Sequence, residues 1–346
     1  MPDSWQKAYK ELQDFIAANP EVVIERSKVN IPNDIRSEFY RLFDRVREDF
    51  VDGKYPVMPV ETVTLSDSYN KVEKEIVELL KLEGISILTA IQNFLHNPKH
   101  CLMREIYDSL FDLLQGKIET GTFEQEASRK LDTSVRDLCS WGYEMWVVLS
   151  LVKLLEPEKV YRLIFDTQVK NHLEEIKNIS IGRQQVYPIS GLPDFVVYSN
   201  KVGKYVALKS ELRKNIYKYY GTALNPRELK DPTDSPTSFG SRVLIIHFIE
   251  KPENILLADS DTGKVTNPEV AIECLEQNEL HDVKSIDEVK HLSELVKPRL
   301  GTYLVFREPV SKLKLDETSD NIYFLEVGFD QSKLQSIISL LTSEVE

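Results

Sequence analysis

Apolar residues recur at helical spacing through the first 130 residues of the chain. Positions 39, 42, 43 and 46 carry Phe, Leu, Phe and Val, and positions 72, 76, 79 and 80 carry Val, Ile, Leu and Leu. Side chains three and four residues apart lie on one face of a helix, so this spacing predicts amphipathic helices. We therefore expect a helical domain over residues 1–130, and we find no motif in it that indicates a chemical activity.

A helix that is apolar on nearly all sides is predicted next, from about residue 133 to residue 155, where Glu156-Pro157 ends it. A helix of this kind is buried in the centre of a domain. Glu144 lies within its apolar surface, and a buried carboxylate requires a partner or a bound cation. The alternative is a partly exposed Glu144, or one that is bonded to a backbone group.

Beyond this helix the apolar pattern changes to that of β-strands. Apolar stretches, most of them rich in Val, Ile, Tyr and Phe, predict strands at residues 180–189, 195–199, 204–210, 242–249, 255–258, 302–306 and 322–327. Helices are expected at residues 158–177, 212–224, 268–277, 286–295 and 331–341. This order predicts an α+β or α/β fold. A core of helix, three strands, helix and strand with a mixed central sheet occupies residues 131–250, and a C-terminal α/β extension occupies residues 251–346.

The composition is that of an ordinary globular protein. Of the 346 residues, 42% are hydrophobic and 29% are charged. No apolar run approaches the roughly 20 residues that span a bilayer, and the N-terminus lacks the features of a secretory signal. Three cysteines without a C-x-x-C spacing indicate thiols in a reducing compartment. We therefore expect a cytoplasmic protein that makes no contact with membranes.

Two of the predicted strands form a hairpin that carries candidate chemistry. Its turn lies at residues 199–203, so antiparallel pairing places Asp194 opposite the neighbourhood of Ser210 and beside Lys209. Side chains alternate between the two faces of a strand, so Ala207, Lys209 and Glu211 lie on the same face. Phosphodiester cleavage uses a hard divalent cation held by oxygen ligands, together with a nearby cationic side chain. Asp194, a second carboxylate and Lys209 would supply these groups.

A basic segment follows the Pro-Asp pair in a chain whose net charge is -13. Residues 199–230 contain eight basic and two acidic side chains, a local charge of about +6. The basic residues include Lys201, Lys204, Arg213, Lys214 and Lys218, and tyrosines are interleaved with the last of them. This arrangement is typical of a surface that binds nucleic acid, although a solvated helix face has the same composition.

Pro193-Asp194, Lys209 and the order of elements over residues 131–250 resemble the PD-(D/E)xK nuclease superfamily. The resemblance covers about a third of the chain. Glu144, in the sequence YEMW, resembles the carboxylate that many members carry on their first helix, as in nuclease subunits of modification-dependent restriction systems. The resemblance implies that Asp194 binds Mg²⁺, that Lys209 assists the chemistry and that Glu144 supports the metal.

The chain departs from the family pattern at Ala207, where the family has Asp or Glu two residues before the lysine. Glu211 lies on the same strand face and is the candidate replacement. Two hypotheses follow. One is a DNA-directed, Mg²⁺-dependent nuclease with metal ligands Asp194 and Glu211. The other is a catalytically inactive nuclease-fold protein that binds nucleic acid or another protein.

One histidine lies on a predicted strand. His247 is part of the predicted strand at residues 242–249, where it is expected to be a strand residue with a satisfied hydrogen bond. Nucleotide-binding and serine-hydrolase motifs such as G-x-G-x-x-G and G-x-S-x-G are absent from the sequence.

Overall fold

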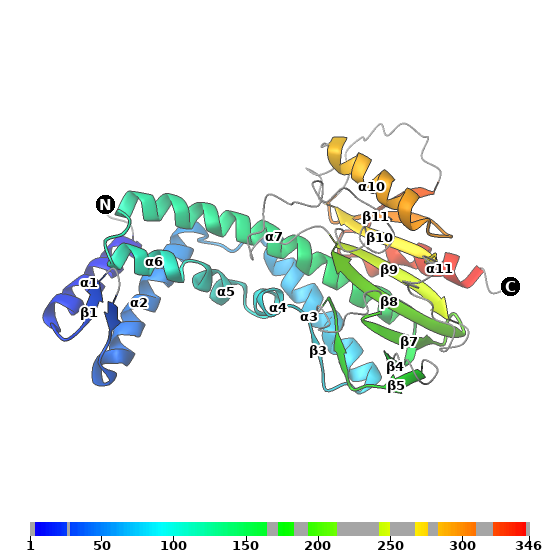
Figure 1. Cartoon of the computed structure of the whole chain (residues 1–346), viewed down its shortest axis with the longest axis horizontal. Coiled ribbons are helices and arrows are strands. Elements are labelled where there is room, and N and C mark those ends of the chain that lie inside the picture. The colour runs from blue at the N-terminus through cyan, green and yellow to red at the C-terminus, as the bar shows by residue number, and fades with distance from the viewer. Residues whose placement is uncertain are drawn as a thin grey trace, which may run out of the picture. The chain divides into compact units, whose positions relative to one another are not determined.

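The computed structural model describes residues 4–25, 28–164, 172–182, 193–212, 242–249, 267–275, 283–308 and 321–343 (Figure 1). The chain divides into two compact units. The helical unit comprises residues 1–67 and 90–139, and the sheet unit comprises residues 68–89 and 140–346. Helix α7 (Thr120–Leu154) contributes its first part to the helical unit and its last part to the sheet unit.

The helical unit is built around aromatic side chains. Its elements are α1 (Ser4–Ala18), the hairpin of β1 (Val23–Glu25) and β2 (Lys28–Asn30), α2 (Asn33–Lys54), the start of α3 (Val60–Leu80), α4 (Thr89–His96), α5 (Pro98–Glu105) and α6 (Tyr107–Leu114). The rings of Phe43 and Phe111 lie 4.6 Å apart between centroids, and those of Trp5 and Phe123 lie 5.3 Å apart. Buried aromatic pairs contribute beyond their buried area. The helical N-terminal region is therefore confirmed.

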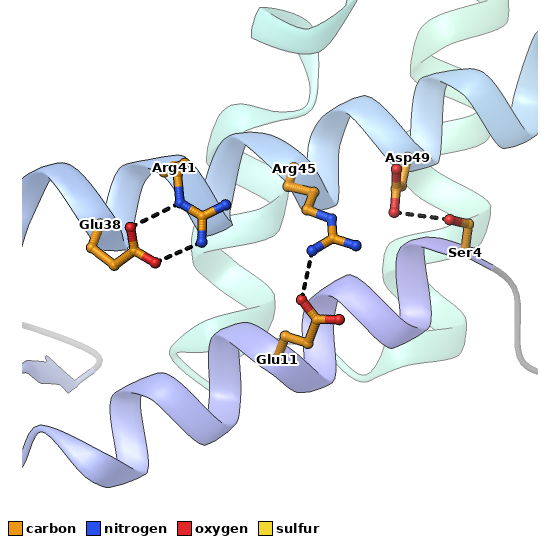
Figure 2. A network of polar contacts seen from close by, with 6 residues as sticks. All are labelled: Ser4, Glu11, Glu38, Arg41, Arg45 and Asp49. Atoms are coloured by element: carbon orange, nitrogen blue, oxygen red, sulfur yellow. Dashed lines mark hydrogen bonds and ion pairs between the residues drawn. The ribbon is translucent and has the colours of Figure 1, made fainter.

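Charged side chains link α1 to α2 on the surface of this unit (Figure 2). Arg45 Nη1 lies 2.7 Å from Glu11 Oε2, and these side chains are 48% and 50% exposed. Water screens such pairs, which contribute about 0.2–1 kcal/mol.

We expect Arg45→Ala to lower the free energy of unfolding by no more than about 1 kcal/mol, measured by urea denaturation. The difference should shrink at high salt. A loss that is independent of salt would contradict an electrostatic origin.

The sheet unit contains an eight-stranded mixed sheet in the order β12-β11-β10-β9-β8-β7-β4-β5. The strands are β4 (Pro157–Ile164), β5 (His172–Glu175), β7 (Phe195–Ser199), β8 (Lys204–Leu212), β9 (Arg242–Ile249), β10 (Val270–Leu275), β11 (Thr302–Phe306) and β12 (Ile322–Glu326). Strands β10, β11 and β12 run parallel, and the other neighbours are antiparallel. Strands β3 (Gly84–Ser86) and β6 (Asn178–Ser180) form a separate parallel pair. The mixed sheet confirms the α+β class.

Helices cover both faces of this sheet (Figure 1). On one face, Leu292 and Val296 of α10 (Val283–Val296) pack against Val243 and Ile245 of β9. Lys209 pairs with Ile245 in register, so residues 205, 207, 209 and 211 of β8 belong to this side, which we call the α10 face. Residues 206, 208 and 210 point to the opposite side, the α7 face. The turn η2 (Gln331–Leu334) and helix α11 (Gln335–Ser343) complete the described unit.

Two predicted helices are strands in the structure. Residues 158–177 were expected to be helical, but β4 and β5 lie there, because Pro157, Val160 and Leu163 are the buried positions of β4 and mimic helical spacing. A register shift between Pro157 and Lys159 puts Pro157 and Val160 on one face of the sheet, and Leu163 is buried on the other face with Val196 and Ala207. Residues 268–277 contain β10, whose residues are buried on both faces and therefore show no alternation.

The other predicted strands and helices agree better with the structure. Strands β7, β8, β9, β11 and β12 lie where the pattern places them, β8 being two residues longer. Helix α10 and the pair η2 and α11 occupy the last two predicted helices. Residues 183–189 of one predicted strand, the predicted strand at residues 255–258 and residues 213–224 of one predicted helix lie outside the described residues.

The cysteines, all within the described ranges, form no disulfide, as predicted. Burial raises the pKa of Cys101 to about 11, so this thiol stays protonated at neutral pH. Among the described helices we find none that combines the length and the apolar character needed to cross a membrane.

Candidate functional site

The hairpin of β7 and β8 brings Asp194 and Lys209 together. Phe195 pairs with Leu208, and the same antiparallel register, continued by one residue, sets Asp194 opposite Lys209. The Asp194 amide donates a hydrogen bond to the Leu208 carbonyl at 2.9 Å. Both side chains therefore belong to the α10 face, within reach of one another.

Two backbone amides fix the Asp194 carboxylate. Its Oδ2 accepts hydrogen bonds from the Ser210 amide at 2.9 Å and from the Gly182 amide at 3.1 Å. The pairing of β7 with β8 ends at Phe195, so this carboxylate oxygen replaces a strand carbonyl for Ser210. In the described part of the chain, Oδ1 has no hydrogen-bond partner, and the residue is partly exposed. One oxygen is thus held while the other is available.

Burial raises the pKa of Asp194 to about 6. The two backbone hydrogen bonds and the charge of Lys209 act in the opposite direction, and the charge of Glu211 raises the pKa further. A desolvated carboxylate close to a second carboxylate favours a bound proton or a bound cation. Asp194 is therefore a suitable ligand for a positive ion.

Lys209 lies beside a second carboxylate. Its Nζ is 3.2 Å from Glu211 Oε2, and the side chains are only 11% and 18% exposed. Asp194 faces Lys209 across the hairpin. Positions 207 and 211 lie two residues before and two residues after Lys209 on β8, so they are the two diagonal neighbours of Asp194. Glu211 thus mirrors the position where the family motif has its second carboxylate.

Ala207 occupies a closed, apolar position. It is 0% exposed, lies opposite Val196 and packs with Leu163. Glu211, by contrast, lies beyond the paired part of β7 and keeps some exposure. A carboxylate at position 211 is therefore accessible to an ion from solvent, and one at position 207 would be buried among apolar side chains.

Glu144 lies on the other side of the sheet. Its Oε1 accepts a hydrogen bond from the Ser210 hydroxyl at 2.7 Å, and both residues are buried. Ser210 points to the α7 face, whereas Lys209 and Glu211 belong to the α10 face. The structure therefore brings Asp194, Lys209 and Glu211 together, and a hydrogen bond to Ser210 links Glu144 to them.

Ser210 was absent from the residues selected by sequence. The feature of the sequence that could have indicated Ser210 is its polar side chain within an apolar strand, on the face that packs against the helix bearing Glu144. Only the register of β8 shows which face that is.

The donor set suits a weakly held hard cation. Among the described residues, no three side chains of His, Cys, Asp or Glu form a cluster able to hold a metal ion. Mg²⁺ keeps several waters in proteins and is often bound by one or two carboxylates together with substrate phosphates. Two carboxylates, Asp194 and Glu211, fit that mode of binding, and Asp194 Oδ1 offers an uncommitted oxygen.

His247 lies on the strand next to the motif. It pairs with Ala207 in register, is 5% exposed, and its Nδ1 has no hydrogen-bond partner in the described ranges, contrary to expectation. Burial and the charge of Lys209 lower its pKa to about 4. The imidazole is therefore neutral at physiological pH and adds to the closed surroundings of Ala207.

The basic segment is only partly described. Lys201 Nζ lies 3.4 Å from Glu156 Oε1, and Lys204 begins β8. Arg213, Lys214 and Lys218 lie outside the described residues. Nucleic-acid binding by this segment stays a prediction.

Comparisons of the chain with models of protein families, with curated proteins and with solved structures find no match. The likeness to PD-(D/E)xK nucleases therefore depends on this chain's own residues and stays a prediction.

Proposed function

We propose that the sheet unit is a nuclease-like domain of PD-(D/E)xK type that hydrolyses phosphodiester bonds of DNA with Mg²⁺ bound by Asp194 and Glu211. The observation that carries this proposal is the flanking of Lys209 by two carboxylates on one sheet face. The second carboxylate has moved from the buried position 207 to the accessible position 211. The proposed ligand pair thus keeps the family's chemistry in a different order along the strand.

Each of the three residues has a distinct role in this proposal. Asp194 is held by two backbone amides, so its free oxygen has a fixed direction. Lys209 places a positive charge where negative charge develops on the phosphate during cleavage. Glu211 orients the Lys209 ammonium through their ion pair. Bound Mg²⁺ would supply a water of lowered pKa and neutralise phosphate charge.

A second candidate function is a nucleic-acid-binding or protein-interaction module without catalysis. The apolar packing of Ala207, at the position where the family has its second carboxylate, favours it. In this case the ion pair of Lys209 and Glu211 stabilises the sheet alone. Affinity for DNA would then fall steeply with salt, since phosphate contacts release counterions, whereas a protein-interaction module would bind no DNA.

Calorimetric titration of the full chain with Mg²⁺ and Mn²⁺ tests the proposal. We expect binding by the wild type and at least about a tenfold loss of affinity in Asp194→Asn and in Glu211→Gln, with parallel loss of cleavage of supercoiled DNA. Glu156→Gln is the matched control, because Glu156 also pairs with a lysine of this hairpin, Lys201. Lys201 lies in the turn, at the opposite end of the hairpin from Asp194. Its affinity should equal that of the wild type. A wild type that binds neither ion at millimolar concentration would overturn the proposal and support the second candidate.

A further inference from the structure

We propose that Ser210 is a positioning residue that couples Glu144 to Asp194, so that Glu144 acts on the candidate metal site without touching the metal. This inference rests on the proposed function for its effect on metal binding. The coupling itself is a property of the metal-free protein and is tested separately below.

Ser210 makes two hydrogen bonds in different directions. Its hydroxyl donates to Glu144 Oε1 at 2.7 Å on the α7 face. Its amide donates to Asp194 Oδ2 at 2.9 Å at the end of β7. One residue of β8 therefore connects a buried carboxylate on one side of the sheet to the candidate ligand on the other.

The chemistry of these bonds explains how the coupling works. Hydrogen bonds to carboxylates are shorter and stronger than those between neutral groups, so Glu144 holds the Ser210 side chain in one rotamer against the strand. Ser210 pairs with Leu244 of β9, and its amide donates to Asp194 Oδ2 just beyond the pairing of β7 with β8, which ends at Phe195. The link to α7 adds a side-chain constraint to the pairing with β9 and holds the amide towards Oδ2. Gly182 provides the second amide, which leaves Oδ1 for the cation.

The same geometry separates Glu144 from the ligands. Its bonded oxygen faces Ser210 on the α7 face, and Lys209 and Glu211 lie on the α10 face. Residues that orient metal ligands affect metal affinity by about 10- to 100-fold when they are changed. Glu144 and Ser210 should therefore show effects of this size although neither reaches the ion.

Four variants of the full chain separate this role from a general contribution to folding. Ser210→Ala and Glu144→Leu remove the side-chain bond, and Ser210→Thr and Glu144→Gln retain its donor or acceptor. Ser199→Ala is the matched control. Ser199 is also a buried serine of this hairpin, and its hydroxyl bonds to the Leu155 carbonyl and the Val202 amide, away from Asp194.

Two measurements are made on each variant: Mn²⁺ affinity by calorimetry, and hydrogen exchange at the Ser210 and Gly182 amides by NMR in metal-free buffer. We expect Ser210→Ala and Glu144→Leu to lower the affinity by about 10- to 100-fold and to speed exchange at both amides. The double variant should be no worse than either single variant, because both remove one coupling. Ser210→Thr and Glu144→Gln should stay close to the wild type.

The outcomes for the two proposals differ. Faster amide exchange in Ser210→Ala, together with a wild type that binds no Mn²⁺, would overturn the proposed function and support the coupling. Unchanged exchange and unchanged affinity in Ser210→Ala would overturn the coupling and leave the metal site standing. Equal changes in Ser199→Ala would also overturn it, because the effect would then be one of stability alone.

Discussion

Replacing Ala207 with glutamate should lower the free energy of unfolding by about 3–5 kcal/mol at pH 7, although it restores the carboxylate of the family motif. Ala207 is 0% exposed, faces Val196 and packs with Leu163, so the new carboxylate would enter an apolar cluster. The nearest cation on the strand, Lys209, is already paired with Glu211. A buried charge without a partner is costly because it loses its hydration. Urea denaturation followed by circular dichroism measures the loss.

Two controls separate burial from charge in this experiment. Asn200→Glu adds the same charge at the exposed turn of the hairpin and should change stability by about 0.5 kcal/mol or less. Ala207→Val tests added volume without charge. Addition of millimolar Mg²⁺ should not restore the stability of Ala207→Glu. If it does, position 207 reaches the metal, and the assignment of Glu211 as the replacement ligand fails.

The hairpin shows which part of the site could be predicted from sequence. The turn at residues 199–203 and the apolar runs on both sides determine the register, and the register places Asp194 beside Lys209. Alternation then places Ala207 and Glu211 on the same face as Lys209. These relations are local, since they depend on residues close together in sequence. For that reason they survive in the folded structure.

Relations across the sheet were not accessible from the sequence. The bond from Ser210 to Glu144 joins residues 66 positions apart, and nothing in either segment specifies which strand lies on α7. Strands β4 and β10 were mistaken for helices for a related reason. The burial of β10 is set by neighbouring strands and covering helices, which hide the alternation expected of a half-buried strand. The alternation of β4 is interrupted by its register shift against β7, a strand about 35 residues further along the chain.

The long helix α7 illustrates how tertiary packing overrides a local signal. Thr133 and Ser134 are typical residues at the start of a helix, and we expected the central helix to begin there. The helix in fact begins at Thr120 and runs to Leu154. Phe123, Ala127 and Leu131 are all fully buried at helical spacing, and this packing continues the helix through the capping residues.

Asp194→Asn should make the metal-free protein more stable by up to about 3 kcal/mol above pH 7, and the gain should vanish below about pH 4. The pKa of Asp194 is raised by burial from 3.8 in the unfolded chain to about 6 in the folded protein. Between these values the folded protein binds more protons than the unfolded chain, so the stability of the wild type falls as pH rises. Asparagine has no charge to desolvate, and its side-chain oxygen can still accept from the Ser210 amide.

The measurement is urea denaturation of both proteins from pH 4 to pH 8 in the presence of a chelator, and then with Mg²⁺. The gain should grow between about pH 4 and pH 6, level off near pH 7 and shrink when Mg²⁺ neutralises Asp194 in the wild type. Glu156→Gln, at an exposed carboxylate, should change stability by less than about 1 kcal/mol throughout. An Asp194→Asn variant that is less stable than the wild type at pH 8 would mean that two backbone hydrogen bonds outweigh the cost of desolvation. Asp194 would then be a structural link between Gly182 and Ser210, and a cation would have no particular reason to bind there.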